Sequence, residues 1–312
     1  MAQPAKDLSA MMKDAPPVGV LEQLEPGIRR ILAPNPSPMT YWGTNTYVVG
    51  TGRVAVIDPG PADDTHLRAI LDGLAPGEQV SHILVTHAHL DHSPLARPLA
   101  EATGAPILAY GDAMAGRSDV MIDLVARGMT TGGEGVDAEF FPDQVIADGQ
   151  LIQGDDWALT AIWTPGHFAN HLSFAMKDAV FTADHVMGWA SSLVSPPDGD
   201  LTAFMASCHR LAARDDRIYY PGHGDPVLDP AARIQWLITH RLGREADILA
   251  ALDGAAKNIP TLTRMIYTDT PPALLGAAER NVFAHLIDLI ARGLVQVHGP
   301  LDFTAVYEKT DP

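Results

Sequence analysis

Short apolar stretches alternate with turn residues and helical segments through the first two thirds of the chain. The stretches TYVVG and VAVID, separated by residues 51–53, predict a β-hairpin. DDTHLRAILDGL has helical spacing with Asp63 or Asp64 as its cap, and Ser93-Pro94 predicts the start of a helix that runs to about Ala102. HILVT, PILAY and IYY predict further strands. Strands interleaved with helices indicate an α/β architecture, although this pattern alone does not choose the sheet topology.

The pattern changes near Asp229-Pro230, beyond which the chain is largely helical. ARIQWLITHRLGREADILAAL, TLTRMIY and PPALLGAAERNVFAHLIDLIARG predict three helices, and LVQVHG and FTAVYE predict two short strands. Three helices followed by two short strands are typical of a winged helix. We therefore predict a larger domain over residues 1–235 and a small winged-helix-like domain over residues 236–312.

Residues 111–135 form a separate segment between two predicted strands. Met114, Met121 and Met129 follow a partly helical pattern here, and the segment ends in TTGGEG, where Gly132-Gly133 would allow the backbone to hinge. Met side chains adapt to irregular apolar surfaces. We predict a lid that shapes a substrate pocket; the alternative is an ordinary surface helix with its methionines packed on the core.

Composition adds the expected surroundings. A chain of 312 residues with 46% hydrophobic residues can bury a sizeable core. The first 30 residues lack the apolar stretch of a secretory signal, and no run approaches the roughly 18–20 apolar residues of a membrane span. Cys208 is the single cysteine, so no intrachain disulfide forms, and we expect it to be a buried small apolar side chain. These features predict a cytoplasmic protein with no membrane partner.

The charge disfavours nucleic-acid partners. The chain has 21 basic and 38 acidic residues, a formal net charge of −17, so its average surface repels polyanions. From Arg241 onward seven basic residues face nine acidic ones, and within the third predicted helix the stretch NVFAHLIDLIARG offers only Arg292 and opposes it with Asp288. We therefore interpret the winged helix as a module for packing, homodimerisation or capping of a small-molecule substrate.

Candidate metal ligands follow four predicted strands. THAHLDH places His87, His89, Asp91 and His92 on a tight loop directly after a strand, where alternate residues can converge on two cations. Further ligand types follow later strands, and these are His167, Asp184 and His223. Neutral imidazole and ionised carboxylate suit zinc and its neighbours in the first transition row.

These motifs resemble those of the metallo-β-lactamase superfamily. THAHLDH is similar to its H-x-H-x-D-H signature, and TPGH, VFTADH and PGHG are similar to its later motifs. The resemblance implies a four-layer αβ/βα sandwich with a dinuclear centre. It assigns ligands as follows: His87, His89 and His167 to the first metal, Asp91, His92 and His223 to the second, and Asp184 as the bridge between them. It also places Asp58 of VIDPG behind the ligands, although this residue could instead simply close a strand at a turn.

A narrower resemblance covers NPSPMTYWGTNTY, TPGHFANHLSFAMKDAVFTADHVMG and HRLGREADILAAL. These segments resemble the branch of the superfamily that contains a mitochondrial endoribonuclease and many bacterial hydrolases with a C-terminal winged helix. That resemblance implies the domain arrangement more strongly than it implies a substrate.

The expected activity is hydrolysis. Two cations that share a water lower its pKa from about 15.7 towards roughly 7, which makes a bridging hydroxide available as nucleophile. Asp91 is the candidate catalytic residue that accepts its proton. We expect two divalent ions, zinc first with iron or manganese as alternatives, and a small ester, thioester, lactone or related acyl substrate. Three alternatives stay open: a metal-dependent endoribonuclease or phosphodiesterase, a non-catalytic binding protein that uses the winged helix, and a mononuclear iron dioxygenase.

Candidate pocket residues lie near these motifs. Tyr41, Trp42 and Trp189 could form an apolar substrate wall, and His171 could line the pocket. A structural position in the core is the alternative for each of them. We interpret His185, which follows Asp184, as structural.

Overall fold

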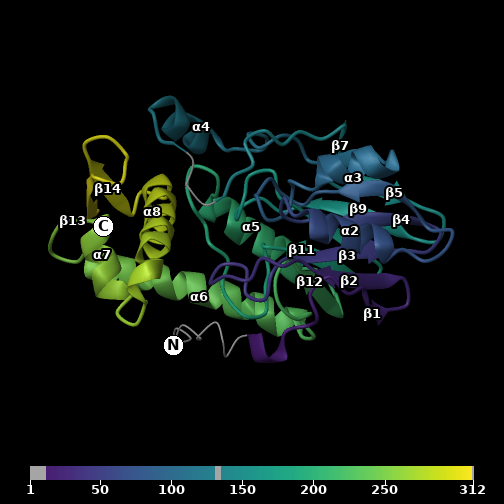
Figure 1. The fold of residues 1–312 in the computed structure, drawn as a ribbon. Coiled ribbons are helices and arrows are strands. Elements are labelled where there is room, and N and C mark those ends of the chain that lie inside the picture. Colours follow the sequence, from purple (N-terminus) through teal and green to yellow (C-terminus); the bar gives the residue numbers. More distant parts are fainter. Residues whose placement is uncertain (1–11, 131–134, 311–312) are drawn as a thin grey trace.

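The computed structural model describes residues 12–130 and 135–310. Two sheets lie face to face with helices on their outer sides, and a helical module packs at one end (Figure 1). A short 3-10 helix, η1 (Met12–Asp14), precedes the first strand. No helix in the described ranges is long and apolar enough to cross a membrane.

The first sheet has seven strands whose spatial order follows the chain. These are β1 (Glu22–Glu25), β2 (Ile28–Leu32), β3 (Asn45–Val49), β4 (Arg53–Ile57), β5 (Gln79–Leu84), β6 (Ile107–Ala109) and β7 (Gln144–Val145). β1 to β4 pair antiparallel and β4 to β7 pair parallel. The predicted hairpin is confirmed as β3 and β4, and the ends of the parallel β4 and β5 bring their following loops together.

The second sheet has five strands. In spatial order they are β12 (Ile218–Pro221), β11 (Ala179–Ala183), β10 (Leu172–Met176), β9 (Ala158–Trp163) and β8 (Leu151–Gln153). β11 and β12 are parallel, with Ala183 paired to Pro221. Because parallel strands end at the same edge, the residues after β11 and β12 lie side by side.

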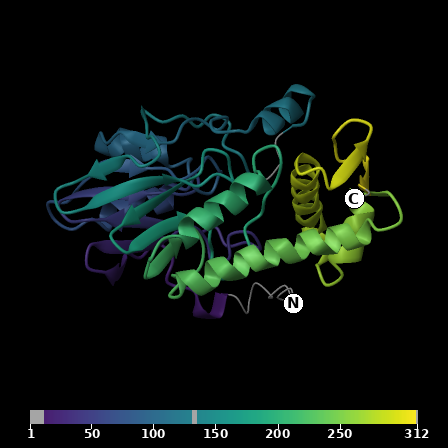
Figure 2. The same ribbon diagram turned by 180° about the vertical axis from the view of Figure 1, so that it is seen from behind.

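The layers confirm the predicted four-layer sandwich. Apolar side chains of both sheets, among them Leu84, Phe174 and Tyr220, form one core between them. α2 (Asp64–Asp72) and α3 (Ala96–Thr103) cover the first sheet, and α5 (Leu201–Ala212) with the start of α6 (Pro230–Ala251) covers the second (Figure 2).

The starts of the two first helices differ from each other. The carboxylate of Asp63 caps α2 by accepting hydrogen bonds from the amides of Thr65 and His66, which settles the choice between Asp63 and Asp64. The predicted cap at Ser93 is wrong: α3 begins at Ala96 without a side-chain cap. The hydroxyl of Ser93 donates instead to the carboxylate of Asp137 at 2.7 Å and lies 3.0 Å from the carbonyl of His89, so it fixes the loop that carries the candidate ligands.

The C-terminal module, residues 257–309, contains the second and third predicted helices and both predicted strands, whereas the first predicted helix is α6, which precedes the module. The elements of the module are β13 (Lys257–Asn258), α7 (Ile259–Ile266), η2 (Pro272–Leu274), α8 (Leu275–Ala291), β14 (Val295–His298) and β15 (Val306–Lys309). β13 was not predicted; it adds a short edge strand beside β15. The boundary that we predict between residues 235 and 236 falls inside α6, whose first part packs on α5 and whose last part packs on the module.

The segment predicted as a lid packs largely on this module. Met121 of α4 (Asp119–Ala126) is buried in the same apolar cluster as Phe283, and Met129 packs against that cluster. Both figures show α4 beside the module. For Met121 and Met129 the alternative of core packing therefore applies, whereas Met114 is exposed. The predicted hinge at Gly132-Gly133 lies outside the described residues.

Candidate metal centre

Four loops at the ends of strands converge on one site. The loop after β5 carries His87, His89, Asp91 and His92, and the loop between β9 and β10 carries His167. Asp184 and His223 follow the adjacent parallel strands β11 and β12. The structure brings all seven predicted ligands together in two groups.

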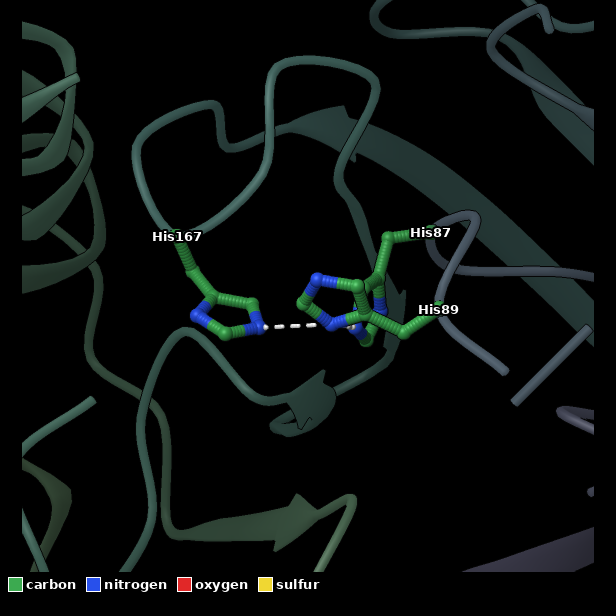
Figure 3. Close-up of side chains that lie close together, drawn as sticks. All are labelled: His87, His89 and His167. Carbon is green, nitrogen blue, oxygen red and sulfur yellow. Dashed lines mark hydrogen bonds between the residues drawn. The ribbon is translucent and has the colours of Figure 1, made fainter. Parts of the chain in front are cut away.

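The first group consists of three histidines. Nδ1 of His89 lies 2.9 Å from Nε2 of His87 and 3.2 Å from Nε2 of His167. Figure 3 shows the three imidazole rings pointing toward one another from two loops. Three imidazole nitrogens that face one point can occupy three of the four ligand positions of a tetrahedral metal site.

The second group combines two carboxylates with two histidines. Oδ2 of Asp91 lies 3.2 Å from Nε2 of His223 and 3.5 Å from Nε2 of His92. Oδ1 and Oδ2 of Asp184 lie 3.5 Å from Nε2 of His92 and 3.3 Å from Nε2 of His223, respectively. Zinc–nitrogen bonds of about 2.0–2.1 Å in a tetrahedral site place ligand atoms roughly 3.3 Å apart, so these separations suit a cation.

Asp184 also approaches the first group. Its Oδ2 atom lies 3.7 Å from Nε2 of His167. Within the described part of the chain, Oδ1 of Asp184 and Nε2 of His92 are buried and have no hydrogen-bond partner. Buried polar atoms are normally paired, so these atoms fit a bound cation better than they fit a closed protein interior. The residues present therefore fit a dinuclear centre.

The distal nitrogens of four histidines are held in place. In each of them Nδ1–H donates to a neighbouring oxygen. His87 donates to Thr86 Oγ1 (2.9 Å) and His92 to Asp58 Oδ2 (2.9 Å). His167 donates to the carbonyl of Leu193 (2.7 Å) and His223 to the carbonyl of Gly43 (3.0 Å). These contacts orient the four rings so that Nε2 of each faces the site.

Asp58 connects two of these contacts. Its carboxylate accepts hydrogen bonds from the amide and hydroxyl of Thr86 at 2.8 and 2.7 Å, besides the bond from His92. It is buried and has a φ of 50°, a conformation that costs a non-glycine residue free energy and tends to occur at functional sites. Asp58 thus lies behind the ligands, as the resemblance implied.

The histidines of the first group are neutral. Burial lowers the pKa of His89 to about 3 and lowers the pKa of His87 and His167 below the usual range. Their neighbouring histidines add to the effect at His87. A neutral imidazole is the form that binds a metal, so this group needs no deprotonation.

The second group is charged. Burial opposes charge on every member, but the carboxylates of Asp184 and Asp91 outweigh it and raise the pKa of His223 to about 10 and that of His92 well above its usual range. The two histidines in turn hold the pKa of both carboxyls well below the usual range, again against burial. Two ionised carboxylates that face one point, that of Asp184 buried and that of Asp91 partly exposed, attract a cation.

Gly222 of the PGHG turn leaves room for Asp184. A β-carbon at this position would lie 2.2 Å from Oδ1 of Asp184 and 2.8 Å from Cε1 of His92. Both distances are far shorter than van der Waals contact, so the second group requires glycine here.

The predicted pocket residues separate into two sets. Tyr41 stacks on Trp189, with ring centroids 4.9 Å apart, and both rings lie against Gly224, next to His223. Each is partly exposed, whereas Trp42 is buried against Tyr41. Tyr41 and Trp189 are therefore better placed than Trp42 to meet a substrate.

His171 lies behind the site rather than in its wall. It is fully buried, its ring centroid lies 5.1 Å from that of His87, and its Nδ1 pairs with Thr164 Oγ1 at 2.9 Å. The structural alternative therefore fits His171. His185 also points away from the ligands, with Nε2 3.6 Å from the sulfur of Cys208, and both are buried as expected.

Several supporting groups escape sequence reasoning. The carbonyls of Gly43 and Leu193 carry no residue signature, because any residue offers a carbonyl. Asn170 joins the loop that carries His87 and His89 to the start of the 111–135 segment, which contains α4. Its side-chain oxygen accepts from the backbone amide of Ala88, and its side-chain nitrogen donates to the carbonyls of Gly111 and Asp112. Its position within the TPGHFAN stretch is the only sequence signal for it.

A four-layer sandwich whose strand ends hold two His/Asp groups defines a class of metal-dependent enzymes, and the comparisons agree with it. The chain belongs to the metallo-beta-lactamase superfamily, because its residues 39–223 match the sequence pattern of that family. Residues 259–300 match the beta-lactamase associated winged helix domain.

Similar proteins include several that match most of this chain. A lactamase-like protein from Aspergillus niger is 32% identical over 79% of this chain and 70% of its own. An atrochrysone carboxyl ACP thioesterase from Cryptosporiopsis sp. is 30% identical over 93% of this chain and 86% of its own. A beta-lactamase-like protein 2 homolog from Caenorhabditis elegans is 30% identical over 88% of both chains.

Solved structures show the same fold. A metallo-beta-lactamase family protein from Thermus thermophilus superposes with a TM-score of 0.74 at 25% identity, over 92% of this chain and all of its own. A beta-lactamase domain protein from Burkholderia ambifaria gives a TM-score of 0.79 at 21% identity over 96% of both chains. The match over nearly full length includes the C-terminal module, so the winged helix is part of the fold.

Proposed function

We propose that this enzyme hydrolyses a small ester or thioester at a dinuclear zinc centre. The observation that carries the proposal is the position of Asp184, whose Oδ2 lies 3.3 Å from Nε2 of His223 in one group and 3.7 Å from Nε2 of His167 in the other. One carboxylate can thus serve two cations. When bound, two zinc ions would acidify a water and polarise the substrate carbonyl.

Asp91 is the catalytic residue of this proposal. Its side chain is 26% exposed, whereas that of Asp184 is 9% exposed, so Asp91 is the carboxylate that solvent and substrate can reach. Its low pKa keeps it ionised at neutral pH, in the form that accepts a hydrogen bond from the attacking water and orients it. The stacked rings of Tyr41 and Trp189 would give the acyl group an apolar wall beside His223.

The acyl substrate class is supported by charge and by relatives. The net charge of −17 disfavours a polyanionic substrate. Two of the similar proteins are named atrochrysone carboxyl ACP thioesterases. Thioesters and esters pass through the same tetrahedral geometry, so one site can act on both.

The C-terminal module supports the same choice. α8, the helix that a DNA reader would place in a groove, buries Val282, Phe283 and Leu286 among its residues. Arg292, which directly follows α8, pairs with Glu245 at 2.5 Å and Asp288 at 2.9 Å, and Arg280 on α8 donates to the hydroxyl of Ser195 at 3.3 Å. A buried helix whose cations already have partners offers little to a phosphate backbone. We propose a structural role for the module and no nucleic-acid partner.

A substrate panel tests this function. Zinc-loaded protein would be assayed on p-nitrophenyl esters, acyl-coenzyme A thioesters, lactones, bis(p-nitrophenyl) phosphate and single-stranded RNA. We expect turnover of an ester or thioester that is lost in Asp91→Asn, while Asp178→Asn, an exposed aspartate near Arg217, stays active. Cleavage of RNA or the phosphodiester without acyl turnover would replace this proposal with the nuclease alternative. A zinc content of one ion or fewer per chain would contradict the dinuclear centre.

A further inference from the structure

Residues 187–195, the segment that follows β11, contact two of the candidate ligands. The carbonyl of Leu193 accepts the Nδ1–H bond of His167 at 2.7 Å. The hydroxyl of Ser192 donates to the carbonyl of Asp184, and it lies 3.0 Å from the carbonyl of His185. The 187–195 segment therefore sets the ring orientation of His167 and the backbone position of Asp184.

The 187–195 segment contains no helix or strand of its own, and α6 and α8 hold it from outside. The guanidinium of Arg241 on α6 donates to the carbonyl of Ser192 and, at 2.9 Å, to Oδ1 of Asn281 on α8. The same Oδ1 accepts the backbone amide of Val194 at 3.2 Å. Arg241 is 2% exposed, and its charged group lies over the ring of Phe204, 5.0 Å from the centroid.

Burying an arginine is costly unless its donors are used, and Arg241 uses one donor on the 187–195 segment and another on Asn281, which also binds that segment, so together they constrain it strongly. The planar fork of arginine reaches Ser192 and Asn281 at the same time, which a lysine ammonium could not do with the same geometry. Arg241 on α6 and Asn281 in the C-terminal module thus connect these two parts of the chain to the backbone that holds His167 and Asp184.

We propose that Arg241 and Asn281 are positioning residues of the metal centre, through which α6 and α8 fix the 187–195 segment and, with it, the orientation of His167 and Asp184. This inference rests on the proposed function, because it requires that His167 and Asp184 bind metal. The C-terminal module would then support metal binding directly, and this role would require neither a further bound molecule nor nucleic acid.

The chain offers a matched control on the same helix. Arg244 lies one turn after Arg241, its side chain is 15% exposed, and its guanidinium lies 4.5 Å from the ring centroid of Tyr267. Its hydrogen bonds go to Asp247 and to the carbonyl of Ile266, away from the 187–195 segment. Arg244→Lys therefore perturbs the contact between α6 and the module without touching the proposed link.

Asn281 offers a conservative pair. Asn281→Leu keeps the number of non-hydrogen side-chain atoms but removes the shared acceptor, whereas Asn281→Asp keeps an oxygen for both Arg241 and Val194. If Asn281 has a purely structural role, zinc affinity should fall in proportion to the loss of packing and stability in each variant. If it is a positioning residue, zinc affinity should depend on whether the acceptor oxygen is present.

The test measures zinc affinity of metal-free full-length protein by competition with a chromophoric chelator, together with the visible spectrum of the cobalt-substituted protein and the Tm of the metal-free protein. Partners behind metal ligands typically change affinity by about 10–100-fold, so we expect that loss in Arg241→Lys and Asn281→Leu, with an altered cobalt spectrum. Asn281→Asp and Arg244→Lys should stay within roughly threefold of the parent, well inside that range.

Two results would decide against the link. Zinc affinities of Arg241→Lys and Asn281→Leu equal to that of the parent would overturn it, and so would an equal loss in Arg244→Lys. If Asn281→Leu does not fold, the comparison of Arg241→Lys with Arg244→Lys gives the same decision. A parent protein that binds no zinc would instead refute the proposed function, which is a different outcome from variants that match a zinc-binding parent.

Discussion

The carboxylate of Asp58 accepts a hydrogen bond of 2.9 Å from Nδ1 of His92, and both side chains are buried. Asp58 also fixes Thr86, whose hydroxyl accepts from Nδ1 of His87, so one carboxylate orients a ligand in each group. Its strained φ of 50° shows that the surrounding structure holds it there.

Asp58→Asn should therefore weaken metal binding at both groups. The amide can present its NH₂ where His92 and Thr86 need an acceptor, and we expect zinc affinity to fall by about 10–100-fold. Chelator competition measures this. Asp63→Ala is the control, because it removes the cap of α2 and should cost about 1 kcal/mol of stability while leaving zinc affinity unchanged. Normal zinc affinity in Asp58→Asn would show that Asp58 only closes its turn.

Gly222 gives a second prediction. A β-carbon there would lie 2.2 Å from Oδ1 of Asp184, so Gly222→Ala must displace the carboxylate or the PGHG turn. We expect loss of at least one zinc ion per chain by elemental analysis and a fall in ester or thioester turnover of about 100-fold or more, equivalent to roughly 2.7 kcal/mol. Gly243→Ala on α6, where an added β-carbon meets nothing within 4 Å, should keep both properties. Full metal content in Gly222→Ala would contradict the predicted clash.

The sequence predicted the seven converging residues better than it predicted what supports them. Each ligand type follows a strand, and strand ends of an α/β sandwich meet at one edge, so residue type and spacing, together with the resemblance to the superfamily's motifs, predicted them. The groups behind His167 and His223 are main-chain carbonyls of Leu193 and Gly43, which have no signature of residue type. Their positions depend on contacts such as Arg241 to Ser192, which are 49 residues apart in the chain.

The helix start at Ser93 and the packing of Met121 show the same limit. A serine before a proline favours a cap, but Ser93 has a tertiary partner in Asp137 that is 44 residues away. The apolar face of a helix between two strands predicts that its side chains are buried, but it does not predict which part of the protein they pack against. α4 buries Met121 on the C-terminal module, where no local pattern could place it.

The position of Met121 leads to a third prediction. It is 2% exposed in the cluster that includes Phe283 and Leu286, so Met121→Ala should lower the free energy of unfolding by about 2–5 kcal/mol. Met114→Ala, at a side chain that is 54% exposed, should change it by less than about 0.5 kcal/mol. Urea unfolding measures both. Equal stabilities of the two variants would indicate that α4 is a detachable lid after all.

His285 on α8 gives a prediction on pH, at a place remote from the candidate ligands in sequence. Within the described ranges, neither ring nitrogen has a hydrogen-bond partner, and the side chain is buried. Burial, and then the charges of Arg241, Arg244 and Arg292 and the ring of His240, lower its pKa well below the usual range. His285 is therefore neutral in the folded protein at pH values where it is protonated in the unfolded chain.

The sign follows from proton binding. Below a pH of about 6.5 the unfolded chain binds a proton at His285 that the folded chain does not, so the free energy of unfolding falls as the pH falls, by about 1.4 kcal/mol per pH unit for one such group. His285→Leu should remove this contribution: between about pH 7.5 and pH 5.5 the variant should lose roughly 1 kcal/mol less stability than the parent. Urea unfolding of metal-free protein at both pH values measures the difference, with His209→Asn, an exposed histidine of α5, as the control that should retain the parent's pH dependence. Parallel loss of stability in His285→Leu and the parent would mean that His285 takes up its proton within the folded protein.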